Sequence, residues 1–392
     1  MKIQHSFFLG LITLSLQLHA AQPAFAVGES VGGFPNWEER VIHEWMNRAR
    51  VEPQVEMSQC ISMYGASRCG ESACFSAIAP LVYSEKLNHA ARFHSDEMRN
   101  QSYFAHDSNC AVPANINQLY PGSCQGAASC ACTTGAATAW NARVMLFGTS
   151  VSGEIIASGQ DPNGAFYQWL FEPSSSTTCA YSTANGHRWN ILKQTGSVGT
   201  GVSGPSVGDF AGGAVTIPKI PSGAHYPRQS ASVAVWANWN DTAAPMSASV
   251  VVDGACQPMT RQRGTDTNGA WSATVTNAAS GCHRYFFLFQ DSTGQTVTYP
   301  TTGSLAIGPA TGCADYDAAR PAAGAGCSVT LPEDPPPGTD PGPGPGTDPG
   351  GTDPGGMASG CNMGGSGGFG AALPLLLSLW GWSRLRRRRG SY

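Results

Sequence analysis

The stretch that decides the fold is residues 186–192, Gly-His-Arg-Trp-Asn-Ile-Leu, which places His187 directly after a glycine. Three further short segments precede it, each with one histidine or glutamate: His106 in 103–106 (YFAH), Glu154 in 153–157 (GEIIA) and Glu172 in 169–172 (WLFE). Imidazoles and carboxylates are groups with which proteins hold divalent metals and transfer protons. These four side chains are therefore the candidate site residues.

The four segments, in this order, resemble the CAP superfamily of cysteine-rich secretory, antigen 5 and pathogenesis-related-1 proteins. That family usually carries F/Y-x-x-H after a helix, then G-E-N-[IL], W-x-x-E and G-H-[RY]. Residues 47–48 (NR) and 94–98 (HSDEM) add to the match, which covers roughly residues 36–210. Ile155 stands where the family usually has Asn, and a long cysteine-bearing stretch separates His106 from Glu154. These departures concern loop geometry rather than the fold.

The resemblance implies an α+β fold, a three-layer α-β-α sandwich whose central cavity is lined by His106, Glu154, Glu172 and His187. Some members of the family hold a divalent metal there through the two histidines. His106 and His187 are therefore candidate ligands for a metal such as zinc, with the two carboxylates orienting them. Because two protein ligands leave several positions open, a polar cavity without metal is the alternative.

Local signals predict three helices in this part of the chain. Residues 36–39 (NWEE) resemble a capping box and precede apolar residues at helical spacing. A second helix is predicted to start at Ser84, with His94 on its apolar face, and we expect His94 to be buried with one hydrogen-bond partner. A third helix begins at residues 161–162, an aspartate cap followed by proline at the first helical position.

Residues 216–312 have a different pattern. Apolar side chains alternate with polar or smaller ones, as at 233–239, 271–275 and 285–289, and turn signals separate these runs. Repeated short segments of this kind predict a small antiparallel β-sandwich that follows the CAP-like part.

Thirteen cysteines indicate an oxidising compartment, since disulfides persist there. Twelve lie between Cys60 and Cys327, an even number, and the absence of a C-x2-C pair argues against a zinc ribbon. We predict that all twelve are oxidised. The sequence cannot assign their connectivity, but Cys256–Cys282 is the preferred pair, and Cys313 with Cys327 would close a small loop beyond it.

The N-terminus predicts export. Lys2, a short apolar stretch and an A-x-A site at 24–26 are typical of a secretory signal peptide, which is removed from the mature protein. The predicted organisation is a signal peptide (1–26), a CAP domain (27–215), a β-sandwich (216–312), a cysteine-stapled connector (313–331), a Pro/Gly/Asp linker (332–359) and a C-terminal sorting or anchor segment (360–392).

The C-terminal segment predicts attachment to the cell envelope. Cys361 precedes an apolar run and the arginine cluster at 384–389. This order resembles the MYXO-CTERM type of bacterial sorting tail, in which a cysteine precedes the helix and processing transfers the protein to the cell surface. The resemblance makes Cys361 the candidate site of a lipid anchor. The apolar run is shorter than the ~20 residues of a comfortable membrane span, and a plain membrane anchor is the alternative.

Two functions from different classes remain open. The resemblance implies a non-enzymatic binding module for lipid, sterol or protein ligands. The alternative is a secreted metal-dependent hydrolase or protease, with Glu154 or Glu172 as general base toward a metal-bound water. The sequence lacks H-E-x-x-H, which favours the binding module. Residues 107–108 (DS) beside His106 are not expected to form a catalytic triad, because residues so close on one loop rarely adopt that geometry.

The charge of the chain bears on its partners. Charged residues make up only 12% of the sequence, and the formal net charge is −4. Nucleic-acid binding usually needs a basic face, so nucleic acid is not an expected partner.

Overall fold

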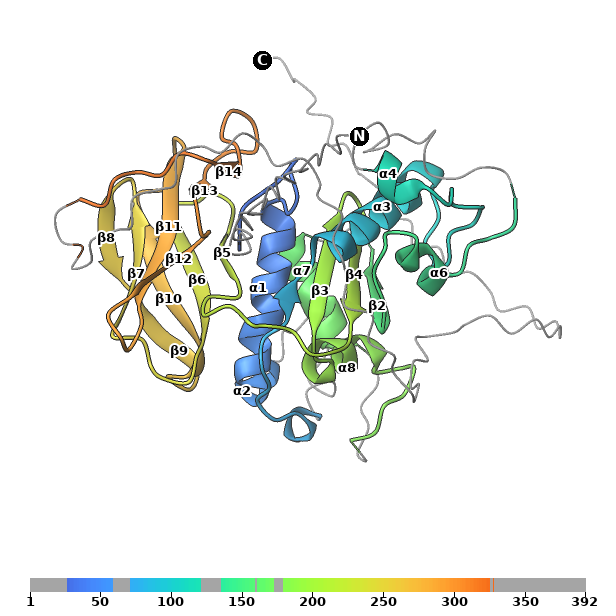
Figure 1. The fold of residues 1–392 in the computed structure, drawn as a ribbon, viewed down its shortest axis with the longest axis horizontal. Coiled ribbons are helices and arrows are strands. Elements are labelled where there is room, and N and C mark those ends of the chain that lie inside the picture. The colour runs from blue at the N-terminus through green and yellow to red at the C-terminus, as the bar shows by residue number, and fades with distance from the viewer. Residues whose placement is uncertain are drawn as a thin grey trace, which may run out of the picture. The chain divides into compact units, whose positions relative to one another are not determined.

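The computed structural model of the protein describes residues 27–58, 71–120, 135–158, 161–172, 179–324 and 327. The chain divides into two compact units, Met1–Gly360 and Cys361–Tyr392, and every described residue belongs to the first. Helices and three mostly antiparallel sheets are combined in this unit, which confirms the α+β class (Figure 1). The predicted signal peptide, the linker at 332–359 and the tail with Cys361 lie outside the described residues.

The first sheet has four strands in the order β1-β3-β4-β2. Their bounds are β1 Val82–Tyr83, β3 Ser197–Val202, β4 Ser206–Ala211 and β2 Gly153–Ala157. β1 is parallel to β3, and the other pairs are antiparallel. The helices around it are α1 Trp37–Val51, α2 Pro53–Ser58, the 3-10 helix η3 Ser72–Cys74, α3 Glu85–Gln101, α4 Ile116–Leu119, α6 Trp140–Met145, α7 Pro162–Leu170 and α8 Gly186–Lys193.

Two glycines in β3 let α3 lie unusually close to the sheet. A Cβ atom on Gly199 would lie 2.0 Å from the backbone nitrogen of Asn88, and one on Gly201 would lie 2.1 Å from that of Arg92. The residues that alternate with them, Val198 and Val202, belong to the core that the sheet shares with α1, α7 and α8. Successive residues of a strand point to opposite faces, so one short strand serves both packing surfaces.

The three helix starts predicted from local signals are confirmed. Asn36 caps α1 through a reciprocal capping box with Glu39. Ser84 caps α3, and Asp161 caps α7 immediately before Pro162. The short helices α4, α6 and α8 were not predicted, because none has an apolar stripe long enough to show helical periodicity.

The segments with alternating patterns form two further antiparallel sheets. The first has the order β5-β6-β10-β9 and the second β14-β13-β11-β7-β8, with β12 also paired to β11. Side chains of both sheets share one core, in which Trp239 of β6 stacks on Phe289 of β11 at 5.6 Å. The bounds are β5 Gly223–Tyr226, β6 Ser232–Asn240, β7 Ser247–Val252, β8 Ala255–Pro258, β9 Thr260–Gly264, β10 Asn268–Thr276, β11 His283–Gln290, β12 Thr296–Tyr299, β13 Ser304–Ile307 and β14 Tyr316–Asp317.

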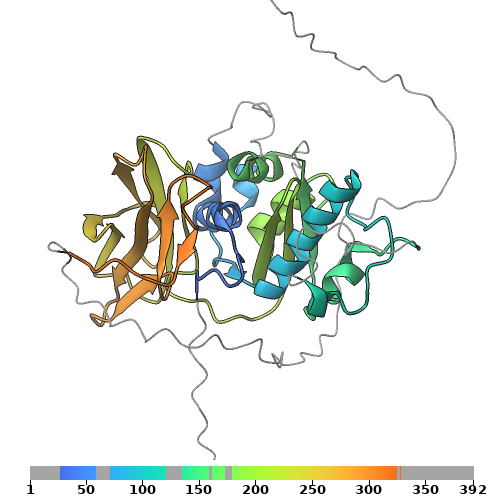
Figure 2. The same cartoon turned by 90° about the horizontal axis from the view of Figure 1, so that it is seen from above.

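Helix α1 also packs against this β region, residues 223–317 (Figures 1 and 2). Trp45 meets Trp236 edge to face at 6.3 Å, and Trp37 stacks on Tyr226 at 6.2 Å. On the same helix, the buried carboxyl group of Glu44 accepts hydrogen bonds from Ser222 and Asn238, each at 2.7 Å. The β region is thus joined to the helices by a packed seam.

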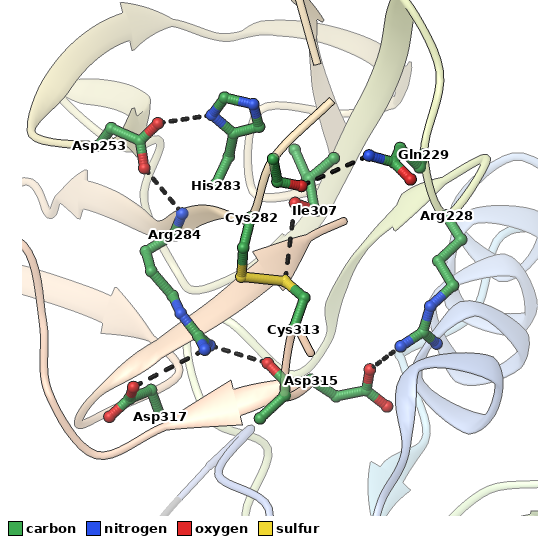
Figure 3. The surroundings of a disulfide bond; sticks show 12 residues. Arg228, Gln229, Asp253, Cys282, His283, Arg284, Ile307, Cys313, Asp315 and Asp317 are labelled. Carbon is green, nitrogen blue, oxygen red and sulfur yellow. Dashed lines mark hydrogen bonds and ion pairs between the residues drawn. A yellow bond between two sulfur atoms is a disulfide. The ribbon is translucent and has the colours of Figure 1, made fainter. Parts of the chain in front are cut away.

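The preferred Cys256–Cys282 pair and the Cys313–Cys327 loop of the predicted connector were both wrong. Cys256 is bonded to Cys327. Cys282 is bonded to Cys313, as Figure 3 shows. Cys256 on β8 lies opposite Val251 on β7, which in turn lies opposite Phe286 on β11. Two strand spacings, about 10 Å, therefore separate Cys256 from the strand that follows Cys282, and a disulfide needs Cα atoms within about 7 Å.

All seven cysteines among the described residues are disulfide-bonded, and the third assigned pair is Cys74–Cys179. In the described part of the chain, no helix has both the length and the apolar character needed to cross a membrane.

Candidate functional site

His106 and Glu154 form the first half of the candidate site. His106 lies on the loop after α3, and Glu154 is the second residue of β2. The Nδ1 atom of His106 is 2.9 Å from Oε1 of Glu154. The carboxylate is fully buried, whereas the imidazole is 23% exposed. The arrangement fixes the ring through Nδ1 and leaves Nε2 without a hydrogen bond to any described residue.

The guanidinium of Arg143 fixes the position of this pair. Its guanidinium is fully buried, forms an ion pair with Oε2 of Glu154 and donates to the backbone carbonyl of His106 at 2.7 Å. Burial alone would raise the pKa of Glu154, but Arg143, His94 and the bond to His106 together lower it to about 2. Glu154 is therefore held in its ionised form.

Asp209 lies beside Glu154, directly opposite it in the β2–β4 ladder. Its side chain is fully buried, and neither carboxyl oxygen has a hydrogen-bond partner among the described residues. Burial and the neighbouring charge of Glu154 raise the pKa of Asp209 well above its usual value, despite the opposing effect of Arg143. The protonated form of Asp209 is thus favoured beside the ionised carboxylate of Glu154.

A second buried network fixes the loop that carries His106. His94 of α3 contacts Oε2 of Glu97 through Nδ1 at 3.2 Å and the carbonyl of Ala105 through Nε2 at 2.9 Å. The predicted burial of His94 is therefore confirmed, although it has two partners rather than one. Burial, followed by the charge of Arg143, lowers its pKa.

The side chains of Asp107 and Ser108 make hydrogen bonds that fix the same loop. Ser108 is fully buried and donates to Glu97 at 2.8 Å, while Asp107 accepts from the backbone N–H of Trp140 at 2.9 Å. Neither contacts the His106 ring in the way that a catalytic triad requires.

His187 and Glu172 form the second half of the candidate site. Glu172 follows α7, and His187 is the second residue of α8. Nδ1 of His187 is 3.1 Å from Oε2 of Glu172, and the backbone N–H of Arg188 donates to Oε1 at 2.8 Å. The buried guanidinium of Arg188 donates to the carbonyl of Glu172 at 2.9 Å and pairs with Glu71. The ring of His187 is 24% exposed and is fixed through the same nitrogen as that of His106.

Close packing of α8 on β2 explains two positions of the sequence pattern. A Cβ on Gly153 would lie 2.4 Å from Oδ1 of Asn190, so a larger residue would push α8 away from the strand. The departure at Ile155 also has a structural role, because its side chain is fully buried in the core shared with α1 and α7.

The four predicted residues therefore form two histidine–carboxylate pairs. Among the described residues, no hydrogen bond or ion pair links one pair to the other, and no group of three or more His, Cys, Asp or Glu side chains is arranged to hold a metal. The four side chains nevertheless suit a metal site chemically, because a metal-binding histidine usually donates the N–H of its other ring nitrogen to a carboxylate.

Sequence reasoning missed Arg143 and Asp209. Arg143 lies in the stretch between the motifs, where no periodic pattern pointed to it. The signal for Asp209 is a lone acid inside the apolar strand β4, since charged residues are rarely buried without a partner.

One family of known proteins matches the part of the chain that contains both pairs. Residues 76–215 match the model of the CAP, cysteine-rich secretory protein family. This segment is therefore similar to the CAP family, and all four candidate residues lie within it. No curated protein matches the chain.

Proposed function

We propose that this is an exported, surface-anchored CAP-domain protein that binds a lipid, sterol or protein ligand and does not catalyse a reaction. In this proposal its CAP part is the three-layer α-β-α sandwich, and His106, Glu154, Glu172 and His187 line one cavity. The observation that carries the proposal is the pairing of each partly exposed histidine with a buried carboxylate through Nδ1, which leaves Nε2 free of that contact in both cases.

His106 and His187 would hold a divalent metal such as zinc through these Nε2 atoms. When bound, the metal would supply a positive charge and open coordination positions for an oxygen atom of a ligand. The residues of this chain orient the rings, because Glu154 and Glu172 each accept from one imidazole and are themselves fixed by Arg143 and Arg188.

Exposed apolar side chains close in sequence to residues of the candidate site support an apolar ligand. Phe104, two residues before His106, is 50% exposed, and Met145 at the end of α6 is 52% exposed. For the second pair, Tyr181 is exposed and packs edge to face on Trp189, two residues after His187. Exposed large apolar side chains next to polar groups are typical of ligand-binding surfaces.

The hydrolase alternative is less well supported. A general base works best when its pKa lies near the operating pH. The pKa of Glu154 is lowered to about 2, and its second oxygen is taken up by Arg143. Glu172 accepts from the N–H of Arg188 and contacts His187. Both carboxylates support histidines, which suits a binding site better than proton transfer.

The test is to purify the full chain from its native envelope without chelator or affinity-tag metal, and to analyse both its metal content and the organic extract by mass spectrometry. A co-purifying apolar compound that is lost from the Phe104→Ala/Met145→Ala variant supports the binding module. Hydrolytic activity that disappears in Glu154→Gln would refute it in favour of the alternative.

A further inference from the structure

A small cavity lies at the seam between α1 and the β region, away from the histidine pairs. Its lining comes from the N-terminal segment, α1, β1 and the residues around β5 and β12: Gly28, Arg40, His43, Tyr83, Pro221 and Tyr299 among others. The space is about that of one water molecule. Any occupant must therefore be very small.

Arg40 is the unusual feature of this cavity. The residue is only 4% exposed, its Nη2 is buried without a hydrogen-bond partner, and its Nε makes a long bond of 3.4 Å to the carbonyl of Gly28. Arg40 forms no ion pair with any described residue. A buried guanidinium without a counter-charge is costly, so a compensating negative group is expected within reach.

The neighbouring carboxylates, Glu39 and Glu29, form their hydrogen bonds and ion pairs with groups other than Arg40. Glu39 also lines the cavity, but it forms an ion pair with Arg92 and accepts from the backbone N–H groups of Asn36 and Val202. Glu29 accepts from both the backbone and the hydroxyl of Thr302 through Oε1, at 2.6 and 3.0 Å, whereas its buried Oε2 has no hydrogen-bond partner among the described residues. In the described part of the chain, neither carboxylate forms an ion pair with Arg40.

Apart from Arg40 and Glu39, the titratable groups of the lining are His43, Tyr83 and Tyr299, and burial disfavours the charged form of each. Burial lowers the pKa of His43 to about 4, and the ring contacts the carbonyl of Leu81 at 2.9 Å. The hydroxyl of Tyr83 donates to Asn88 at 3.0 Å. Within the described lining, Arg40 thus supplies the one positive charge that faces the space.

We propose that this cavity binds a small monovalent anion of chloride size, held by Arg40. Chloride is close to water in size, needs only donors and a positive charge, and fits where sulfate, phosphate or a carboxylate would not. Because the lining comes from α1 and from the β region, the bound anion would stabilise the seam between them. A ligand that binds only the folded state raises the unfolding temperature as its concentration rises.

The experiment is thermal unfolding of the full chain at constant ionic strength, with chloride replaced stepwise by the larger gluconate anion. We expect the unfolding temperature to rise with chloride along a saturating curve, and Arg40→Met to weaken the apparent chloride affinity by at least about tenfold. Arg261→Met, which removes an exposed arginine of β9, is the matched control and should keep the wild-type response.

An unfolding temperature that depends on ionic strength alone, or an equal chloride response in wild type and Arg40→Met, would mean that the cavity holds water only and would overturn the proposal. Should Arg40→Met fail to fold, crystals of the wild type grown in bromide decide the question. An anomalous peak next to Nη2 of Arg40 supports the anion site, and its absence refutes it.

Discussion

Arg143 of α6 and Glu154 of β2 form an ion pair from which water is excluded on both sides. The same guanidinium donates to the backbone carbonyl of His106, whose ring contacts the other oxygen of Glu154. One arginine therefore fixes both the position of the loop and the charge of the carboxylate that orients the histidine. The candidate site depends on a residue that belongs to none of the four family segments.

Replacing Arg143 should greatly lower the free energy of unfolding. Arg143→Gln leaves the carboxylate of Glu154 buried without its counter-charge, and removal of one partner of a buried pair typically costs about 3–5 kcal/mol of unfolding free energy. Urea unfolding at neutral pH measures this loss. The double variant Arg143→Met/Glu154→Gln should lose clearly less than the sum of the two single variants, because it removes both charges together. Additive losses would mean that the pair is not coupled.

The sequence could locate the two histidine–carboxylate pairs but not their support. The motifs around His106, Glu154, Glu172 and His187 are local, and each is recognisable within a few residues. The role of Arg143 depends instead on the docking of a six-residue helix against the His106 loop. A helix of that length has too little apolar periodicity to be predicted, and long-range ion pairs leave no spacing in the sequence.

Glu44 should make stability depend on pH. Burial raises the pKa of Glu44 to about 8, although Ser222, Asn238 and Arg48 oppose this effect. The folded state then keeps a proton up to about pH 8, whereas the unfolded state releases it near the ordinary glutamate pKa of 4.5. Stability should therefore fall as pH rises between these values. Glu44→Gln should flatten this fall and be more stable than wild type at pH 8, by roughly 1–3 kcal/mol.

Urea unfolding at several pH values between 4 and 9 measures this effect. Glu44→Leu is the control, because it removes the same titration and also takes away the acceptor that lies 2.7 Å from the amide of Asn238. We expect it to lose stability at every pH. A wild-type profile that stays level from pH 5 to pH 8 would contradict the assignment of a neutral Glu44 at the seam.

The disulfides give a direct check of strand order. Peptide mapping under non-reducing conditions should recover Cys256 linked to Cys327 and Cys282 linked to Cys313. Thiol labelling of the denatured, unreduced protein should find none of the twelve cysteines from Cys60 to Cys327 free. Recovery of a Cys256–Cys282 peptide would place β8 next to β11. The sequence showed the alternation of these strands but not their order, because order is set by non-local pairing.

The C-terminal segment carries a prediction that rests on sequence alone. The order of a cysteine, an apolar run and an arginine cluster predicts that the mature chain ends near Cys361 and that this residue carries the anchor. Cys361→Ala should leave the arginine-bearing tail attached and reduce retention at the surface. Intact-mass measurement of surface protein tests this, and a wild-type chain that still contains residues 362–392 would favour the plain membrane anchor.

The last prediction concerns metal binding by the two histidine pairs. If His106 and His187 hold one ion between them, each single alanine variant should lose nearly all of the zinc affinity, because neither imidazole alone binds tightly. If they are separate weak sites, each single variant should lose only its own share and the double variant the sum. Zinc titration into chelator-stripped full-length protein distinguishes these results, and the shared site predicts one zinc per chain.

His283 provides the matched control for this titration. Its Nδ1 lies 2.7 Å from Asp253, as in the two candidate pairs, but its Nε2 is engaged by the carbonyl of Ser280 at 2.8 Å. An imidazole with both nitrogens occupied cannot offer a lone pair to a metal, so His283→Ala should bind zinc as wild type does. Equal binding by wild type and His106→Ala/His187→Ala would show that zinc binds elsewhere. The pairs would then be supports of the loop and of α8, since their carboxylates are anchored by Arg143 and Arg188 whether or not a metal is bound.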